Sequence, residues 1–219
     1  MSSAKHDILN KIHRGLTDVP KSEKPEDVTV NRNYRMHGGL SRDEVVKMFA
    51  ERAGEYKATV HRVGEEQIKK EIAISCRKEK VQNLVIPDGF PENLIPDTIT
   101  PMFDSLQAPL SHHELDQADG VITMCAFAIA QTGSIILDAG QGQGRRVLTL
   151  LPDYHLCIVR PEQIVELVPE GFSSVESSVQ KENRPITIIS GPSATSDIEL
   201  IRVEGVHGPR RLGIIIIDE

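Results

Sequence analysis

The start of the chain predicts two helices, the first from the spacing of its apolar residues and the second from a capping motif. From Ile8 to Leu16 every fourth residue is apolar, which predicts a helix over residues 4–16 with one apolar face. Residues 17–39 are polar and contain two prolines, a composition typical of a linker or an exposed arm. A second helix is predicted to begin at residues 41–44, Ser-Arg-Asp-Glu, because this serine and glutamate can form a capping box.

Beyond this point, short apolar strands alternate with helical stretches. Such alternation predicts one α/β domain over residues 41–219, built on a parallel sheet, with residues 1–40 as an N-terminal helical arm. Residues 91–109 are rich in proline and are expected to be irregular, and residues 127–130 are expected to form a short helix or turn. The predicted strands are 58–63, 83–87, 120–124, 134–137, 156–159, 185–190 and 212–217, and the later helices are 65–76, 111–117, 161–168 and 173–180.

Composition excludes several classes of function. The chain of 219 residues has a formal net charge of −7 and 4% aromatic residues, so it lacks the basic stripe and stacking aromatics of a nucleic-acid-binding protein. It contains no run of about 18 apolar residues, so no membrane span is expected. The first residues lack the apolar core of a secretory signal, and a cytoplasmic location is expected.

The cysteines do not support a metal or cluster site. Cys76, Cys125 and Cys157 are widely spaced, and no Cys-x-x-Cys pair occurs, so neither a zinc ribbon nor an iron–sulfur cluster is predicted. Cys125 and Cys157 lie in apolar sequence and are expected to be buried, inert thiols. His112-His113-Glu114 does not have the His-Glu-x-x-His spacing and is expected to be a solvated face. We therefore expect no metal and no cofactor.

A glycine-rich loop is the main candidate for chemistry. Residues 134–137 predict a buried strand, and the loop that follows ends in Gly144-Arg145-Arg146. Glycines allow the backbone to approach a ligand, and arginines supply forked donors for carboxylate or phosphate, so the pattern favours an anion site. The loop matches neither the dinucleotide fingerprint nor the P-loop, and a hairpin with a solvated tip is the alternative.

A second polar loop, residues 191–197, follows the strand predicted at 185–190. Its hydroxyls and successive N–H groups are typical of an anion nest. Because ligands of open α/β sheets bind at the carboxyl ends of strands, both loops are expected to lie there. His207 lies in a third loop and can titrate near neutrality, although a solvated loop histidine is the commoner case. Asp197 and Glu199 would share a face of a strand, so general acid–base catalysis by this pair of carboxylates is an alternative.

Several motifs together resemble the LUD domain family, the family of lactate utilisation protein C. The resemblance covers about residues 120–217 and rests on these blocks in their order: Ile-Ala-Gln-Thr-Gly-Ser at 129–134, the Gly-Gln-Gly-Arg-Arg loop, Leu-Leu-Pro-Asp-Tyr-His at 150–155, Gly-Pro-Ser-Ala-Thr-Ser-Asp-Ile-Glu at 191–199 and Gly-Val-His-Gly-Pro at 205–209. It implies a Rossmann-like sheet of the sugar-phosphate isomerase and CoA-transferase (NagB/RpiA-like) type. It also implies a role in oxidising L-lactate to pyruvate, as the cluster-free partner of iron–sulfur proteins. The chain departs from the family at Gln131, where glutamate is usual.

Three hypotheses follow. The chain is a component of a lactate oxidation system with an anion pocket, a stand-alone enzyme on a phosphorylated or CoA-linked small molecule, or an assembly or regulatory subunit that docks through its N-terminal helix. The sequence leaves open whether the chain is catalytic alone. The candidate ligand-binding residues are Thr132, Gly133, Gly142, Gly144, Arg145, Arg146, His155, Gly191, Ser193, Ala194, Thr195, Asp197, Glu199, His207 and Gly208.

Overall fold

The computed structural model of the protein describes residues 2–20, 22–24, 27, 33–195, 203–204 and 208–218. Internal contacts divide the chain into two units, residues 1–35 and residues 36–219. The first unit contains helix α1 (Ser2–Gly15), which includes nearly all of the helix predicted at residues 4–16. Its apolar face remains exposed: Ile8 is 59% accessible and Ile12 is 51% accessible.

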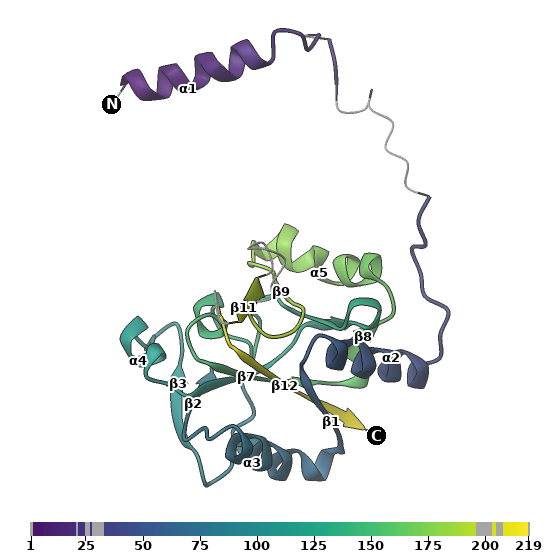
Figure 1. Ribbon diagram of the computed structural model, residues 1–219, viewed down its shortest axis with the longest axis vertical. Coiled ribbons are helices and arrows are strands. Elements are labelled where there is room, and N and C mark those ends of the chain that lie inside the picture. Colours follow the sequence, from purple (N-terminus) through teal and green to yellow (C-terminus); the bar gives the residue numbers. More distant parts are fainter. Residues whose placement is uncertain are drawn as a thin grey trace. The chain divides into compact units, whose positions relative to one another are not determined.

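Six parallel strands form the central sheet of the second unit, in the order β1-β12-β7-β4-β2-β3 (Figure 1). The two strands β12 and β7 lie inside the sheet and are buried along almost their whole length, which explains their continuous apolar sequence. The predicted α/β class with a parallel sheet is therefore confirmed. The strand bounds are β1 Thr59–Gly64, β2 Asn83–Pro87, β3 Thr100–Asp104, β4 Gly120–Met124, β7 Tyr154–Val159 and β12 Arg211–Asp218.

Helices cover both faces of this sheet because each carries apolar residues at helical spacing. Helix α3 (Ile68–Lys78) packs Ile68 and Ile72 against residues such as Leu156 on one face. Helix α2 (Arg42–Glu55) packs Val46 and Phe49 against the other face. The capping box predicted between Ser41 and Glu44 is present at the start of α2.

A second, mostly antiparallel sheet lies over the α2 side and has the strand order β8-β5-β6-β9. Strand β6 (Ser134–Leu137) pairs antiparallel with β5 (Phe127–Ile129) and with β9 (Thr187–Ile189), and β8 is Ile164–Val165. Helix α5 (Val168–Glu182) packs Val175 against this sheet. The predicted helix over residues 161–168 is wrong, because the chain there forms a short 3-10 turn and then β8, and the helix begins only at Val168.

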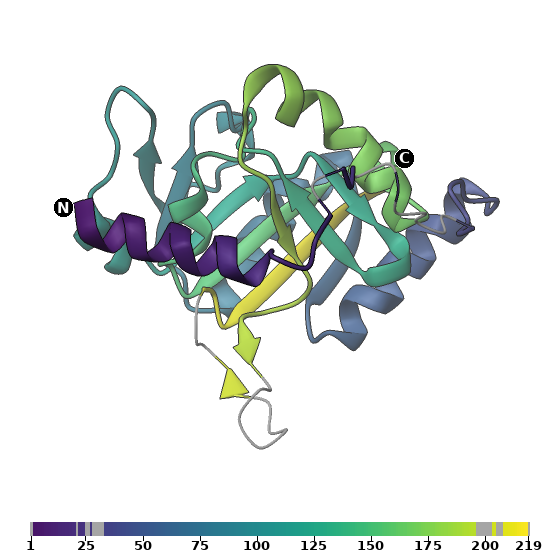
Figure 2. The same cartoon turned by 90° about the horizontal axis from the view of Figure 1, so that it is seen from above.

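Three further stretches differ from the sequence expectation. Residues 127–130 were expected to form a short helix or turn, but residues 127–129 form strand β5 and only the 3-10 turn that follows begins at residue 130. Strand β3 lies within the stretch expected to be irregular; it is an edge strand of the parallel sheet, where Pro101 is tolerated. Strands β10 (Ala194–Thr195) and β11 (Val203–Glu204) form a small antiparallel ribbon that projects from the two sheets (Figure 2). The short helix predicted near residue 111 is α4 (His112–Asp116). The remaining 3-10 turns are Glu65–Gln67, Glu92–Leu94, Ala130–Thr132, Arg146–Thr149 and Pro161–Gln163.

Across the described part of the chain, no helix combines the length and apolar character needed to cross a membrane.

Candidate functional site

The glycine-rich loop lies over the topological switch point of the parallel sheet, where the chain connections from two neighbouring strands run in opposite directions along the sheet. From β2 the chain continues to β3 on one side, and from β4 it continues to β7 on the other side. The carboxyl ends of β2 and β4 therefore mark the topological switch point, the usual ligand position in open α/β sheets. Gly142 bridges the ends of these two strands. Its N–H donates to Asp88 O at 2.9 Å, and its carbonyl accepts from Met124 N at 2.8 Å.

The strands that precede the two predicted loops are not in the parallel sheet. The loops were expected at carboxyl ends of parallel strands, but β6 and β9 belong to the second sheet, so that reasoning is wrong. The loop after β6 nevertheless crosses over to the carboxyl ends of β2 and β4. Gly142 has φ +71°, and a Cβ there would lie 2.8 Å from Met124 Cγ, so this position needs glycine for its fit against the protein. Gly144 has φ +70°, and a Cβ there would lie 2.8 Å from Pro87 Cβ.

Hydrogen bonds inside the loop hold it in one conformation. Asp138 Oδ1 accepts from Gly140 N and from Gln143 Nε2, and Gln143 Oε1 accepts from Asp138 N at 2.8 Å. The other oxygen of Asp138 accepts from Ser178 Oγ at 2.7 Å and lies 3.5 Å from Arg184 Nη1, which joins the loop to α5. The N–H groups of Gly140, Gly142 and Gln143 thus donate within the protein, so they do not form an open phosphate cradle.

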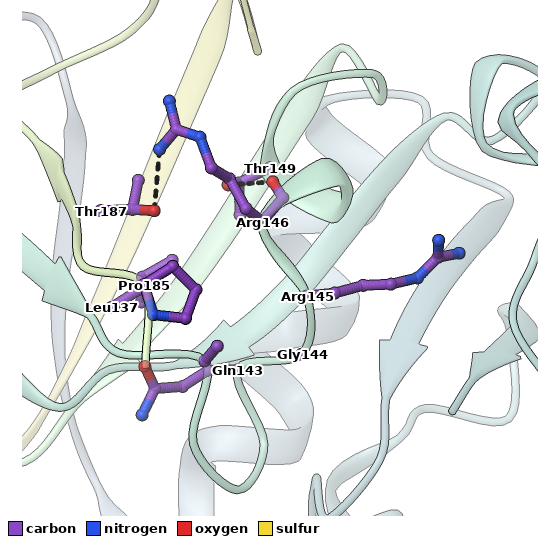
Figure 3. Close-up of a pocket in the computed structure, with 9 residues that line it drawn as sticks. Leu137, Gln143, Gly144, Arg145, Arg146, Thr149, Pro185 and Thr187 are labelled. Carbon is purple, nitrogen blue, oxygen red and sulfur yellow. Dashed lines mark hydrogen bonds between the residues drawn. The ribbon is translucent and has the colours of Figure 1, made fainter. Parts of the chain in front are cut away.

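The two adjacent arginines point in different directions (Figure 3). Arg145 donates to both oxygens of Asp104, with its Nη2 2.6 Å from Oδ1, and also to Leu110 O. Asp104 is 3% exposed, and its hydrogen bonds raise the pKa of Arg145 further above its ordinary value. Arg145 therefore serves to anchor the end of β3, because its charge is already matched by a buried carboxylate.

Arg146 has a neutral partner. Its Nη1 donates to Thr187 Oγ1 at 2.9 Å, and no carboxylate of the described residues lies within ion-pair distance of it. It lines a small cavity with Gln143, Thr149 and Thr187, walled on its apolar side by Leu137 and Pro185. The cavity measures about 10 Å³, room for roughly one water molecule.

Thr132 and Gly133 lie at the opposite end of β6 from Arg146. Four residues of β6 separate the two places, a span of about 10 Å. Gly133 has φ +60°, and a Cβ there would lie 2.4 Å from Ala53 N, so its role is close packing against α2. Thr132 Oγ1 bonds Ser134 Oγ at 2.8 Å, which in turn bonds Ser190 Oγ at 2.6 Å.

The same end of the second sheet contains two more positions of interest. Gly191 packs against Tyr56, the residue that caps the end of α2, since a Cβ there would lie 2.5 Å from Tyr56 O. Gln131 is exposed, and its N–H donates to Glu166 O at 3.0 Å. The described residues therefore place Thr132, Gly133 and Gly191 together, apart from the Arg146 cavity.

His155 is enclosed in the parallel sheet. It is 1% exposed and shares a hydrogen bond of 2.8 Å between its Nε2 and Thr123 Oγ1. Burial lowers the pKa of His155 to about 4, so the ring is neutral at physiological pH. A ligand on the surface has no access to this side chain.

Residues 191–195 of the second polar loop lie near the turn that carries Arg146. Ser193 N donates to Pro209 O at 2.8 Å, and a Cβ at Gly208 would lie 3.5 Å from Thr149 O and 3.7 Å from Ser193 Cβ. Thr149 ends the 3-10 turn that begins at Arg146, so Gly208 borders that turn and Ser193 lies beside Gly208. Ala194 and Thr195 form β10, while Asp197, Glu199 and His207 lie outside the described residues.

The three cysteines are buried free thiols, as predicted for Cys125 and Cys157. A hydrogen bond with Cys157, together with burial, raises the pKa of Cys125 well above its ordinary value. Burial raises the pKa of Cys76 to about 12. In the described part of the chain, no group of three or more His, Cys, Asp or Glu side chains is placed to hold a metal ion.

Sequence reasoning missed four residues that shape this region: Asp104, Asp138, Gln143 and Thr187. Asp138 and Gln143 lie in the glycine-rich stretch, where a carboxylate and an amide five residues apart are a usable signal of a braced loop. Asp104 and Thr187 are each 41 residues from their arginine, so no local pattern marks them.

Similarity to known proteins fits this architecture. The sequence matches the LUD domain over residues 46–217. The chain belongs to the LUD domain family. It is 42% identical to lactate utilization protein C of Deinococcus radiodurans over 216 residues, covering 99% of this chain and 96% of that protein. It is 25% identical to lactate utilization protein C of Halalkalibacterium halodurans, covering 98% of this chain and 96% of that protein.

A solved structure extends the similarity to three dimensions. The crystal structure of a DUF162 family protein from Deinococcus radiodurans matches with a TM-score of 0.71 and 40% identity, covering 82% of this chain and 100% of that chain. The similarity of the named relatives supports involvement of this LUD domain protein in lactate utilisation.

Proposed function

We propose that this LUD domain chain is the cluster-free component of a cytoplasmic system that oxidises L-lactate to pyruvate together with iron–sulfur proteins. The observation that carries the proposal is its similarity, at 42% identity over 99% of its length, to a protein named lactate utilization protein C. The cluster-free part rests on the sequence, which has three widely spaced cysteines and no Cys-x-x-Cys pair.

The same proposal assigns an anion pocket to the turn that begins at Arg146. Arg146 supplies the charge, since Arg145 is bound to Asp104. Thr187 supplies a hydroxyl, and Gly208 borders the turn at Thr149 with Ser193 beside it. Thr132, Gly133 and Gly191 brace α2 against the second sheet and do not belong to this pocket.

The role is tested by deleting the gene for this chain and growing the strain on L-lactate as sole carbon source, with growth on pyruvate as the control. We expect loss of growth on L-lactate alone, restored by the wild-type chain. Unchanged growth on L-lactate would contradict the role. A defect on both carbon sources would contradict it as well, because the lesion would then lie after pyruvate.

Helix α1 favours a second candidate, an assembly role. Its apolar residues form a stripe at positions 8, 9 and 12, continued by Leu16 just after the helix, and these four residues are between 44% and 59% exposed. An amphipathic helix with such a face is typical of helix-in-groove recognition. Deletion of residues 1–20 would then abolish co-purification with the lactate oxidation proteins while ligand binding by the remaining chain is retained. Co-purification that survives the deletion would exclude this candidate.

A further inference from the structure

We infer that a cavity beside helix α2 binds a small zwitterion of the amino acid class, whose carboxylate pairs with Arg42 and whose ammonium group pairs with Glu170. The cavity measures about 280 Å³ and shares no lining residue with the cavity beside Arg146. The inference therefore goes beyond the proposed function and does not depend on it. It is carried by the place of the cavity in the fold, by its two charged side chains, and by its size and walls.

The cavity lies where three elements of the second unit meet. Strand β8 lies next to helix α2 and next to helix α5 (Figure 1). Arg42 comes from the first turn of α2, and Glu170 comes from the first turn of α5. Because both helices are packed against sheets, the two charged side chains start from fixed backbone positions, as a specific site requires.

Arg42 carries a positive charge that no carboxylate of the described residues neutralises. Its Nη1 donates to Pro161 O at 3.0 Å and to Ile164 O at 2.6 Å, which are two neutral carbonyls. A guanidinium has five N–H donors in a planar fork, so the donors on Nε and Nη2 remain available to another acceptor. The bonds to the two carbonyls also order the side chain, which lowers the entropy cost of binding a carboxylate.

Glu170 supplies the opposite charge in the same lining. Its Oε1 accepts from Gly38 N at 3.0 Å, and its Oε2 accepts from Leu167 N at 2.8 Å. Burial opposes ionisation, but these backbone donors and the nearby His37 hold the pKa of Glu170 below its ordinary value, so the carboxylate is charged at neutral pH. Each carboxylate oxygen has two lone pairs, so each can accept one more hydrogen bond, from an ammonium group.

The two charges line one cavity without forming an ion pair with each other. An α-amino acid carries its ammonium group and its carboxylate on the same carbon atom, so it can pair with both side chains at once. A ligand with a single charge would satisfy one side chain and leave the other unmatched. Glu166, which is 5% exposed, accepts from Gly39 N at 2.6 Å and from Leu40 N at 2.8 Å, and it thereby holds the segment that completes the lining.

The size and the walls of the cavity suit a small aliphatic ligand. Its volume of about 280 Å³ lies just below the range of roughly 300–1,000 Å³ that is typical of pockets for drug-sized molecules, which favours a smaller ligand. Leu40, Val45 and Val165 contribute apolar side chains to the lining. Such walls suit the side chain of an amino acid of the size of valine.

The test is isothermal titration calorimetry of the purified full-length chain with L-valine and two analogues. Isovalerate is valine without its ammonium group, and isobutylamine is valine without its carboxylate. We expect L-valine to bind at least about tenfold more tightly than either analogue, because each analogue loses one set of hydrogen bonds to a charged side chain.

Two variants separate the contributions of the charges. Arg42→Gln should weaken the binding of L-valine about tenfold without weakening that of isobutylamine, and Glu170→Gln should weaken L-valine about tenfold without weakening isovalerate. The matched controls are Arg77→Gln, at an exposed arginine of α3 on the opposite face of the parallel sheet, and Glu176→Gln, at an exposed glutamate of α5. Both controls should bind L-valine as the wild type does. Thermal melts verify that each variant is folded.

The inference is overturned if the wild type binds no L-valine at tens of millimolar, or if it binds L-valine no more tightly than the two analogues. These measurements need no variant, so they decide the matter even where a substitution prevents folding. Wild-type affinity for L-valine in folded Arg42→Gln or Glu170→Gln would overturn the inference as well.

Discussion

Replacing Arg145 by glutamine should destabilise the protein, although its neighbour Arg146 tolerates the same change. Arg145→Gln removes the partner of Asp104, a carboxylate that is 3% exposed. The remaining described side-chain hydrogen bond of Asp104 comes from Leu110 N, at 2.9 Å. Breaking a buried ion pair by removing one partner costs about 3–5 kcal/mol. Because the Arg145 side chain is 28% exposed, we expect a smaller loss of about 2–4 kcal/mol in the free energy of unfolding.

The assay is urea unfolding followed by circular dichroism, with a thermal melt in parallel. For a domain of this size the loss corresponds to a midpoint about 5–15 °C lower. Arg146→Gln, an exposed position with one neutral partner, should stay within about 0.5 kcal/mol of the wild type. The double variant Asp104→Asn, Arg145→Gln should lose less than the sum of the two single variants, because neither change then leaves a buried charge. The reasoning is refuted if Arg145→Gln is as stable as the wild type, or if both arginine variants lose the same amount.

Three further predictions concern the stability and the buried side chains of the second unit. Gly133→Ala should cost about 2–4 kcal/mol in urea unfolding, because a Cβ at φ +60° would lie 2.4 Å from Ala53 N; an unchanged midpoint would show that α2 moves aside without cost. His155 has a folded pKa of about 4 against about 6.5 when unfolded, so the unfolded state binds the extra proton and stability should fall by up to about 3 kcal/mol as the pH drops from 6.5 to 4. His155→Gln should lack that part of the pH dependence, and equal slopes for both proteins would argue against a buried neutral ring. The three buried thiols should react with Ellman's reagent only after unfolding, and fast labelling of the native protein would contradict their burial.

The parallel sheet could be predicted because its inner strands are buried on both faces. Strands such as β7 and β12 are continuous apolar runs, and a capping box marks the start of α2 in the sequence. Strand β3 was hidden by Pro101, which only an edge strand tolerates. Strand β8 has two residues, too few for any periodicity, and Pro161 before it imitates the start of a helix.

The site was predictable in its position along the chain but not in its geometry. The glycines of the loop after β6 mark positive φ angles and close approaches, and both are found at Gly142 and Gly144. What the sequence could not tell is which arginine is already neutralised. That depends on Asp104 and Thr187, which tertiary structure brings to Arg145 and Arg146 from distant strands. The same limit explains why the candidate ligand-binding residues include both Thr132 and Arg146, although β6 holds them apart.

The most direct test of the account is the rate of L-lactate consumption in a strain that lacks this chain and is complemented by single variants. Wild type, Arg146→Gln and the control Arg77→Gln, a change at an exposed arginine of α3, would be compared at equal protein level, verified by immunoblot. We predict that the wild type and Arg77→Gln restore consumption and that Arg146→Gln does not, because it keeps the fold and loses the charge of the proposed anion pocket. Full restoration by Arg146→Gln would contradict the claim that lactate utilisation depends on this arginine.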